Sequence, residues 1–461
     1  PFREHRSMWH ELLIGYAHGG YHNSTLMPED YAAMEAKLDE LSMRIENTAQ
    51  GAAVCLLDTG DEDFLFNPLE FDRTEWVNVN GQWRRTKVPA LGMAKISDTV
   101  QNYGAGSIQE DSISGNGQSD VLSWEGFRKG CRLSLAVERG EVALLTANFT
   151  SREELNPTVK RAEASPVPGG DVRSLHFACE QTKAKVTMSC FPEEPFIRVR
   201  THLKTSLENA RFLLQVSIPW GKPTIIADEP FLVRERDPLG EPQVDLMRSR
   251  PVGMFESPEE SSSDVSEGEN RGVFYGHTFA AAEGPEGGIA LVNRGTPGYQ
   301  FTGRELGNIL LSVRTPKSLD QYRRCSHLLP PHECVFKHLL FFYSPRERNA
   351  VYRLARAFNF PLLHLKGERM PEPRLVSGLP PNIYLSAAYW DEGVVLRFFE
   401  MEGKVTECEL TLPCPREFVL EECNLLLRPM PGSTAVAGQQ GRVQLAFSPY
   451  EIKTVRLRCS A

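Results

Sequence analysis

Short β-prone runs separated by turn residues dominate the sequence after residue 51, and they restrict its possible folds more than any other feature. Examples are TEWVNV, CRLSLAVE, RSLHFACE, FIRVRTHLK and RFLLQVSI. Val, Ile, Thr and aromatic residues favour strands, whereas Gly, Pro, Asn and Asp between the runs favour tight turns. Strands of this length without long intervening helices form antiparallel sandwiches rather than βαβ units. The sequence therefore predicts a mainly β chain of consecutive antiparallel β-sandwich domains.

The first 50 residues differ because their apolar side chains recur at helical spacing. Pro28 suits the first position of a helix, and Gly51 lies just past its last turn. This pattern predicts a short N-terminal helical segment, whose apolar stripes need a surface to pack on. Because the chain starts at Pro1 rather than Met, we expect that surface in an upstream part of a longer polypeptide.

The length of 461 residues exceeds what one hydrophobic core supports, because a domain typically contains roughly 100–200 residues. A further helix is predicted at RERNAVYRLARAF, ended by Pro361. We expect a helical segment at 1–50, a small β domain at 51–130, a large β-sandwich at 131–345, a helix and linker at 346–381, and a C-terminal β-sandwich at 382–461.

Charge and cysteine content exclude several functional classes. The net charge is −9, and Lys and Arg are scattered, which disfavours nucleic acid as a partner. No run approaches the roughly 18 consecutive apolar residues of a spanning helix, so we expect no membrane span. The ten cysteines include no CxxC pair, which disfavours a structural zinc site. The compartment stays open between the cytoplasm and a secretory or lysosomal lumen.

Three local clusters have simple structural explanations. The acidic run DTGDED at 58–63 lacks the spacing of a calcium-binding loop, and we expect a solvated loop between strands. The segment HLLPPHECVFKH superficially resembles a metal cluster, but structural roles are favoured for its His and Cys residues. Trp76 and Trp220 are interpreted as core or sheet-packing residues rather than as platforms for a sugar.

The turn LVNRGTPGY at 291–299 is a candidate binding loop. Arg294 can hydrogen-bond to a sugar and Tyr299 can stack on one, and sandwich loops often carry binding residues. Asn293 and Gly295 also suit a tight turn for purely conformational reasons, which is the alternative.

Several stretches, taken in order, resemble the region downstream of the catalytic barrel in glycoside hydrolase family 38, the α-mannosidases. These stretches are FNPLEFDRTEWVNV with VPALGMA, IPWGKPTIIADEPFLVRER, GGIALVNRGTPGYQF, GNILLSVRTP, LARAFNFPLL and FSPYEIKTVRLR. The resemblance implies that the helical segment is part of a helical bundle and that the large sandwich is of the galactose-mutarotase type.

The resemblance also places the motif YAHGGYHNST at 16–25. In the family, a histidine at this position completes the catalytic zinc site, and His18 matches it. The family aspartate that follows and helps to hold the substrate is matched by Gly19, which has no side-chain oxygen. The alternative for His18 is a helix C-cap, in which Gly19 or Gly20 ends the helix.

The resemblance implies zinc-dependent, retaining hydrolysis of α-mannosides when the chain is joined to its catalytic barrel. The catalytic carboxylates and the remaining zinc ligands belong to that barrel, and this chain contributes none of the carboxylates. The expected partners are the barrel or another subunit and a mannose-containing carbohydrate, with a homo-oligomer possible. The alternatives are an accessory subunit that has lost catalysis, and a lectin-like module that rests on fold analogy alone.

Overall fold

The computed structural model describes most of the chain after residue 56, and a short helical stretch before it. The described residues are 36–37, 39–45, 47–48, 51, 57–79, 82–96, 132–140, 153–155, 157–167, 170–191, 193–239, 272–313, 332–344, 347–368, 376–412, 417–430, 436–438 and 440–459. They belong to two compact units. Unit 1 comprises the described parts of Pro1–Glu46, Ala105–Ala227 and Glu235–Glu347, and unit 2 those of Asn47–Gly104, Asp228–Arg234 and Arg348–Ala461.

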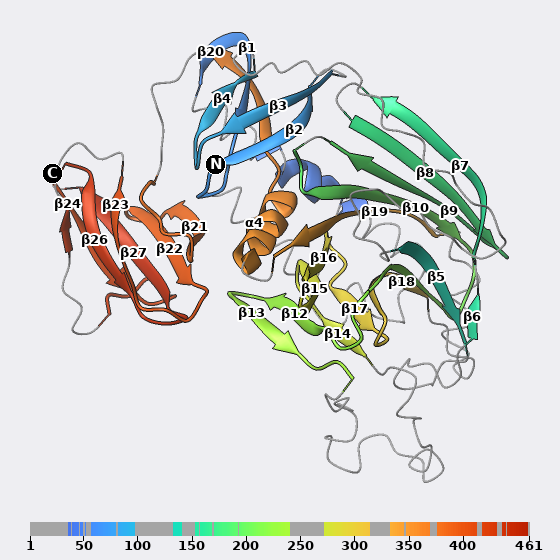
Figure 1. Cartoon of the computed structure of the whole chain (residues 1–461). Helices are drawn as coiled ribbons and strands as arrows, with labels where there is room; N and C mark the ends of the chain where they lie inside the picture. Colours follow the sequence, from blue (N-terminus) through green and yellow to red (C-terminus); the bar gives the residue numbers. More distant parts are fainter. Residues whose placement is uncertain are drawn as a thin grey trace. The chain divides into compact units, whose positions relative to one another are not determined.

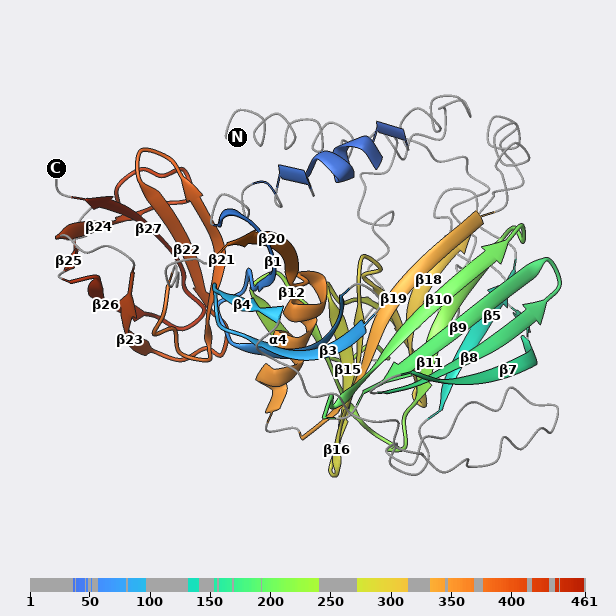
Figure 2. The ribbon, with the colours of Figure 1, turned by 90° about the horizontal axis from the view of Figure 1, so that it is seen from above.

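A nine-stranded antiparallel sheet, formed mainly by strands of unit 1, is one layer of a sandwich (Figure 1). In spatial order its strands are β13 (Leu232–Arg236), β12 (Thr224–Glu229), β15 (Phe279–Gly284), β16 (Gly287–Asn293), β19 (His332–Tyr343), β10 (Phe196–Thr205), β9 (Thr182–Cys190), β8 (Gly170–Cys179) and β7 (Thr158–Val167). Figure 2 shows the long neighbouring strands β19, β10, β9, β8 and β7 side by side.

A six-stranded sheet forms the second layer of this sandwich. Its strands are, in order, β14 (Val273–Tyr275), β17 (Gly298–Phe301), β18 (Glu305–Val313), β11 (Ala210–Ser217), β5 (Leu133–Arg139) and β6 (Glu153–Leu155). Both sheets contribute to one hydrophobic core, for example through Val199 and Leu291 from the first and Phe212 and Leu135 from the second. Burial of these apolar faces holds the two layers together.

The burial pattern along the strands explains why this sequence forms a sandwich. In β10, Ile197, Val199 and Leu203 are buried, while the intervening Arg200 and His202 are exposed, which is the alternation of a half-buried strand. The strands β11 and β16 are buried along nearly their whole length, in agreement with their continuous apolar runs.

The described residues of unit 2 form four smaller sheets. The three-stranded sheet has the order β20 (Leu363–Glu368), β1 (Asp58–Phe66) and β4 (Met93–Lys95), and β2 (Arg73–Val79) pairs with β3 (Gln82–Val88). The terminal sheets are β21 (Ile383–Trp390), β22 (Val394–Glu400), β27 (Ile452–Cys459), β24 (Phe418–Cys423) and β25 (Val436–Gly438), in that order, and the pair β23 (Thr406–Thr411) and β26 (Arg442–Phe447).

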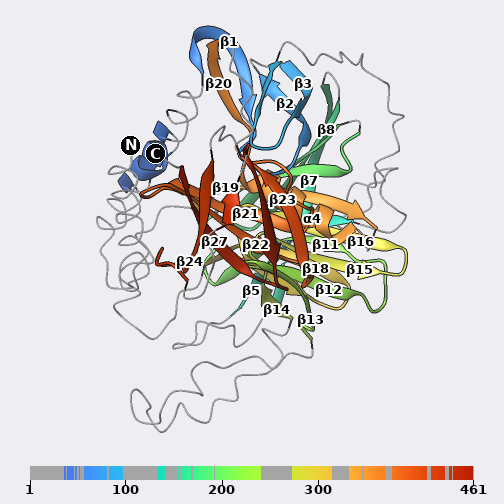
Figure 3. The same cartoon turned by 90° about the vertical axis from the view of Figure 1, so that its left-hand side faces the viewer.

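The two terminal sheets form a second sandwich, whose strands are shown in Figure 3. Phe398 and Val455 from the five-stranded sheet share a core with Leu410, Val443 and Phe447 from the two-stranded sheet. The alternating burial of β26, in which Val443, Leu445 and Phe447 are buried, directs this face towards the core.

Helix α4 (Arg348–Asn359) packs within unit 2. Just before the helix, the backbone N–H of Ser344 donates to Glu347 Oε2 at 3.3 Å. Val351, Tyr352 and Ala355 are buried on one face of the helix, and Pro361 follows its last turn. The Tyr352 ring meets Tyr384 of β21 edge-on at 4.9 Å, which couples the helix to the terminal sandwich.

The predicted fold class is confirmed: the described chain is mostly strands, arranged in several antiparallel sheets and sandwiches. Residues 36–37, 39–45 and 47–48 are helical, and the remainder of the predicted N-terminal segment lies outside the described residues. The expectation of a loop at 58–63 is wrong, because these residues form the first part of β1. No helix among the described residues is long and apolar enough to cross a membrane.

Candidate functional site: a surface turn, buried polar clusters and a cavity

The predicted zinc ligand lies outside the part of the chain that the structure describes. Residues 1–35, which include His18 and Gly19, are not among the described residues. Within the described ranges, no three His, Cys, Asp or Glu side chains gather in a way that could hold a metal ion. The described residues therefore offer no zinc site of their own, and the role of His18 stays a prediction.

The candidate binding turn joins β16 to β17. Asn293 ends β16, and its Oδ1 accepts a hydrogen bond from the Thr296 backbone N–H at 3.0 Å, which closes an Asx-type turn. Gly295 has φ +90°, a backbone conformation that residues other than glycine rarely adopt. Arg294 lies at the exposed tip of this turn.

The structure places Tyr299 in the interior rather than beside Arg294 on the surface. Its side chain is 0% exposed. Its hydroxyl donates to the Leu291 carbonyl at 2.9 Å and accepts from Asn293 Nδ2 at 2.9 Å. This is the environment of a tyrosine that stabilises a turn, so the conformational alternative explains Tyr299, while the binding role of Arg294 remains a prediction.

A buried polar group, here called the turn cluster, lies beneath this loop and consists of Asn293, Thr296, Tyr299, Asn308 and His338. Asn308 Nδ2 donates to the carbonyls of Thr296 and Gly298 at 2.6 and 2.9 Å. Since a carbonyl can only accept, these two bonds fix the orientation of the amide. Asn308 Oδ1 then accepts from the Thr296 hydroxyl at 2.7 Å and from His338 Nε2 at 2.9 Å.

The protonation state of His338 follows from this arrangement. Its Nε2 carries the proton that it donates to Asn308, and burial lowers the pKa of the imidazole to about 3. The neutral ring is therefore a structural donor at physiological pH. In the segment HECVFKH, His332 and Cys334 are partly buried earlier on β19, whereas His338 lies in the turn cluster.

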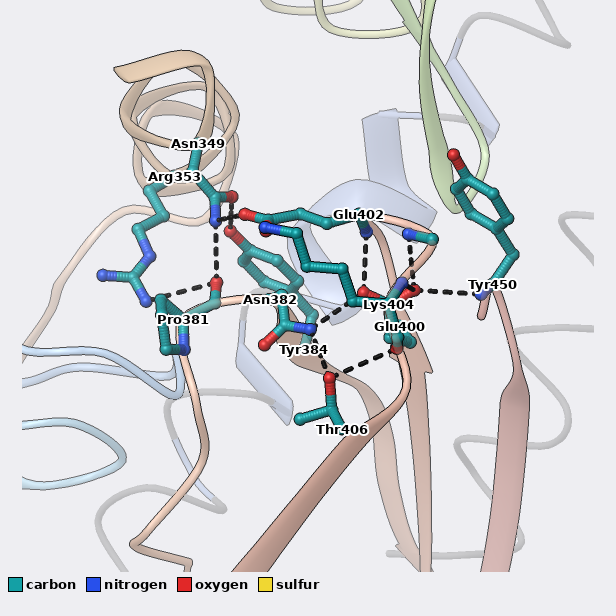
Figure 4. Close-up of polar contacts among 11 residues, drawn as sticks. Asn349, Arg353, Pro381, Asn382, Tyr384, Glu400, Glu402, Lys404, Thr406 and Tyr450 are labelled. Atoms are coloured by element: carbon teal, nitrogen blue, oxygen red, sulfur yellow. Dashed lines mark hydrogen bonds and ion pairs between the residues drawn. The ribbon is translucent and has the colours of Figure 1, made fainter. Parts of the chain in front are cut away.

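Unit 2 contains a different buried group, here called the Glu400 cluster (Figure 4). Glu400, at the end of β22, is 1% exposed. Its Oε1 accepts from Asn382 Nδ2 and from the Glu402 N–H, both at 2.8 Å. Its Oε2 accepts from the backbone N–H groups of Gly403, Lys404 and Tyr450 at 2.7, 3.2 and 2.9 Å.

These bonds determine the ionisation of Glu400. Burial alone would raise the pKa of the carboxyl, but the hydrogen bonds from Tyr450, Asn382, Glu402 and Lys404 outweigh burial and lower it. The carboxylate thereby fixes the 400–404 turn against the loop before β27. Because its acceptor sites are occupied by this chain's own donors, Glu400 is a structural anion rather than a catalytic one.

The Glu400 cluster extends to helix α4 through Asn349, as Figure 4 shows. Asn349 Nδ2 donates to Glu402 Oε1 at 2.5 Å and to the Pro381 carbonyl at 3.1 Å. Tyr384 donates its hydroxyl to Asn349 Oδ1 at 2.5 Å, and burial raises the pKa of that hydroxyl. These contacts attach the first turn of α4 to the strand β21.

The last turn of α4 is capped by a side chain from β2. Arg73 donates through Nη1 to the Phe360 carbonyl at 2.7 Å and through Nη2 to the Ala357 carbonyl at 2.8 Å. Its guanidinium also pairs with Glu75 at 2.6 Å. A cation is favoured at a helix C-terminus because it offsets the negative end of the dipole and satisfies unpaired carbonyls. No sequence signal links Arg73 to a helix almost 300 residues further on.

A cavity of about 340 Å³ lies in unit 1 at the hairpin between β15 and β16. Its lining includes Trp220, Glu286, Gly288, Tyr343, Ser344 and Glu347. Glu286, Ser344 and Glu347 are exposed, so the cavity is accessible to solvent. It combines aromatic side chains with carboxylates. The sequence analysis assigned none of these residues to a site.

Comparison with known proteins identifies the terminal sandwich. Residues 386–455 match the family model described as the glycosyl hydrolases family 38 C-terminal beta sandwich domain. No curated protein matches the chain in sequence.

Two solved structures from Enterococcus faecalis share the fold of nearly the whole chain. One is described as a protein in the glycosyl hydrolase family 38, with a TM-score of 0.68, 13% identity and coverage of 99% of this chain. The other is described as an alpha-mannosidase from strain V583, with a TM-score of 0.65, 13% identity and the same coverage. This chain spans 66% and 63% of their respective lengths.

These findings define the chain as a multi-sandwich protein, and they confirm the resemblance expected from the sequence. The chain has the fold of the C-terminal portion of glycoside hydrolase family 38 proteins and carries the family's C-terminal sandwich domain at 386–455.

Proposed function

We propose that this chain is the C-terminal portion of an α-mannosidase-like glycoside hydrolase that hydrolyses α-mannosides when joined to its catalytic barrel. The observation that carries the proposal is the coincidence of a family 38 sandwich domain at 386–455 with a fold match over 99% of the chain. In this proposal the sandwiches and α4 support the barrel, and a mannose-containing carbohydrate is the substrate.

Retaining hydrolysis needs two carboxylates about 5–5.5 Å apart, one to attack the anomeric carbon and one to transfer a proton. We assign both to the barrel, as the family resemblance implies. The buried carboxylate Glu400 does not supply this chemistry, because it accepts five hydrogen bonds from its own chain. Bound zinc would orient and polarise the substrate hydroxyls, and His18 is the residue of this chain proposed to hold it.

The test uses the intact gene product, including whatever is encoded ahead of Pro1. We expect bound zinc, cleavage of an aryl α-mannoside with retained anomeric configuration, and loss of bound zinc in a His18→Ala variant. A gene product that is folded but contains no metal and cleaves no mannoside would reject the hydrolase. A Gly51→Ala variant is the control for His18→Ala, because the added methyl meets no atom within 4 Å among the described residues, its chain neighbours and own helix backbone apart.

The second candidate is an accessory or structural subunit that has kept the scaffold and lost catalysis. The observation that favours it is Gly19, which stands where the family has an aspartate that contacts substrate. A glycine offers no side-chain oxygen to a sugar hydroxyl. If the intact product binds zinc without turnover, and Gly19→Asp confers turnover, the loss of this one side chain explains the inactive state.

A further inference from the structure

The cavity in unit 1 has two aromatic walls that depend on glycines of the β15–β16 hairpin. A methyl group on Gly284 would lie 2.2 Å from Cδ2 of Trp220, and one on Gly288 would lie 2.4 Å from Cζ of Tyr343. Both rings therefore lie directly against the hairpin backbone, at distances that only glycine allows. Trp220 packs on the hairpin, as the sequence predicts for a sheet-packing residue, and it also lines the cavity.

The Tyr343 ring is fixed by contacts with two neighbouring side chains. The hydroxyl of Tyr343 donates to Glu283 Oε1 at 2.8 Å, and both side chains are buried. The ring of Phe341 stacks on Tyr343 at a centroid distance of 5.6 Å. A ring that is anchored at its hydroxyl, its face and the hairpin backbone forms a preorganised wall, which lowers the entropy cost of binding.

Two exposed carboxylates lie at the same cavity. Glu286 occupies the hairpin loop between β15 and β16, and Glu347 follows β19. The Oε2 atom of Glu347 accepts a hydrogen bond from the Ser344 N–H at 3.3 Å, and the Glu347 N–H donates to the Ser344 carbonyl at 2.7 Å. Both the side chain and the backbone of Glu347 are therefore held by Ser344. A carboxylate has about four acceptor sites, and one backbone bond leaves acceptor capacity for a ligand.

We propose that this cavity binds one hexopyranose unit of a glycan. The volume of about 340 Å³ lies at the lower end of the range of about 300–1,000 Å³ typical of small-molecule sites, which fits one sugar ring better than a chain. A pyranose has an apolar face of C–H groups that packs on an aromatic ring, and a rim of hydroxyl donors that suits carboxylate acceptors.

An alkylammonium ion is the competing ligand, because it also favours an aromatic face and carboxylates. The choice of a sugar rests on the proposed function, in which the chain belongs to a glycan-processing protein. The assay below therefore compares both ligands, and it requires neither the barrel nor zinc.

The experiment titrates the 461-residue chain with methyl α-mannopyranoside in the presence of EDTA. Binding is followed by tryptophan fluorescence and by saturation-transfer NMR of the ligand. We expect saturable binding with a dissociation constant of about 1 mM, equivalent to a binding free energy of about −4.1 kcal/mol. Trp220→Ala should weaken binding at least about tenfold, while Trp220→Phe should retain most of it, because a phenyl face replaces the indole face.

Matched variants separate ligand contacts from folding. Trp390→Ala removes an indole that is 58% exposed in unit 2, and it should leave binding unchanged. Glu286→Gln with Glu347→Gln should weaken binding several-fold, and glutamine at position 347 keeps an acceptor oxygen for the Ser344 N–H. Gly288→Ala should also weaken binding, because its methyl displaces Tyr343. Circular dichroism verifies that each variant is folded.

Three outcomes would overturn the inference. These are absence of saturable binding to the folded chain, equal binding by the Trp220→Ala and Trp390→Ala variants, and preferential binding of tetramethylammonium over the mannoside at equal concentration. None of them bears on hydrolysis by the intact gene product, which is tested by its own metal and turnover assay. Conversely, an inactive gene product that still binds the mannoside through Trp220 would support this site and reject the hydrolase.

Discussion

The turn cluster of unit 1 and the Glu400 cluster of unit 2 each stabilise a turn by hydrogen bonds among buried polar groups, but the groups differ in charge. The turn cluster uses neutral groups, since amide, hydroxyl and neutral imidazole pair with one another around Asn308. The Glu400 cluster uses one carboxylate that accepts four backbone N–H groups and one amide. Hydrogen bonds to a charged group are stronger, but more donors are left unpaired when that group is removed.

The two clusters also respond to acid over different pH ranges. The folded-state pKa of His338 is about 3, below the ordinary value of 6.5, so the unfolded chain binds the proton first and stability falls as the pH drops below about 6.5. The pKa of Glu400 is lowered from 4.5, so its contribution is present above about 4.5 and is lost as the pH falls through the folded-state value. On acidification, the turn cluster should therefore weaken first.

The largest loss of unfolding free energy should come from Glu400→Ala. The substitution leaves the N–H groups of Gly403, Lys404 and Tyr450 without their acceptor, and we expect unit 2 to lose about 3 kcal/mol of unfolding free energy. Hydrogen exchange of the 386–455 segment at several urea concentrations measures this loss. Glu407→Ala, which removes an exposed carboxylate from β23, is the control and should change the free energy by less than about 0.5 kcal/mol.

If Glu400→Ala costs no more than the control, the charged cluster is not more sensitive than the neutral one, and the comparison fails. Glu400→Gln gives an intermediate test. Its amide retains one acceptor oxygen but directs an NH₂ group towards backbone donors, so we expect its cost to lie between those of the other two variants.

The second largest loss of unfolding free energy should come from Arg73→Met. Methionine keeps much of the apolar volume but leaves the Ala357 and Phe360 carbonyls of α4 without their donors, at a cost of about 2 kcal/mol. Amide exchange in the last turn of α4 and in β2 should accelerate together. Lys87→Met is the control on β3, since its side chain is 69% exposed and pairs with Asp72 only at 3.8 Å.

Much of the secondary structure could be predicted because it depends on local pattern. The runs TEWVNV, CRLSLAVE, RSLHFACE, FIRVRTHLK and RFLLQVSI correspond to β2, β5, β8, β10 and β11, and the predicted helix corresponds to α4. The acidic segment 58–63 was predicted wrongly because its conformation is decided by a distant partner. Asp63 and Phe64 of β1 pair with Lys366 and Leu365 of β20, and His364 Nε2 lies within hydrogen-bond distance of Asp63 Oδ1 at 2.8 Å.

The candidate sites were harder to predict, since they depend on contacts that sequence spacing does not encode. The pattern of β19 explains why His338 was not recognised as a core residue. Glu333, Val335 and Lys337 are exposed in strict alternation, but from His338 to Phe341 four consecutive residues are buried. The cavity was missed for a similar reason, because Gly284 and Gly288 acquire their roles only when Trp220 and Tyr343 pack on them.

The third prediction concerns the pH response of the turn cluster. With pKa values of 6.5 unfolded and about 3 folded, His338 should cost unit 1 about 1.4 kcal/mol at pH 5.5 relative to pH 8. His338→Gln should remove this dependence, whatever its effect on stability at pH 8, because glutamine does not titrate. The measurement is segment-resolved hydrogen exchange of β18 and β19 against pH, corrected for intrinsic exchange. The exposed His202→Gln variant should keep the slope of the original chain; a slope that survives His338→Gln would assign it to other groups.

The smallest loss of unfolding free energy should come from Tyr299→Phe. This variant removes an uncharged hydroxyl from the turn cluster, whereas Glu400→Ala removes a carboxylate from the Glu400 cluster. Phenylalanine fills the same volume, but the Leu291 carbonyl and Asn293 Nδ2 each lose the bond to the hydroxyl, so we expect a cost of about 1 kcal/mol.

The same variant tests the role of the turn in substrate binding. Because the Tyr299 ring is fully buried, Tyr299→Phe should leave the KM of the intact gene product for an aryl α-mannoside unchanged, whereas Arg294→Ala at the exposed tip should raise it if the predicted contact exists. A raised KM in both variants would mean that the hydroxyl acts on substrate through the shape of the turn, and the turn cluster would then be part of the binding site rather than its support.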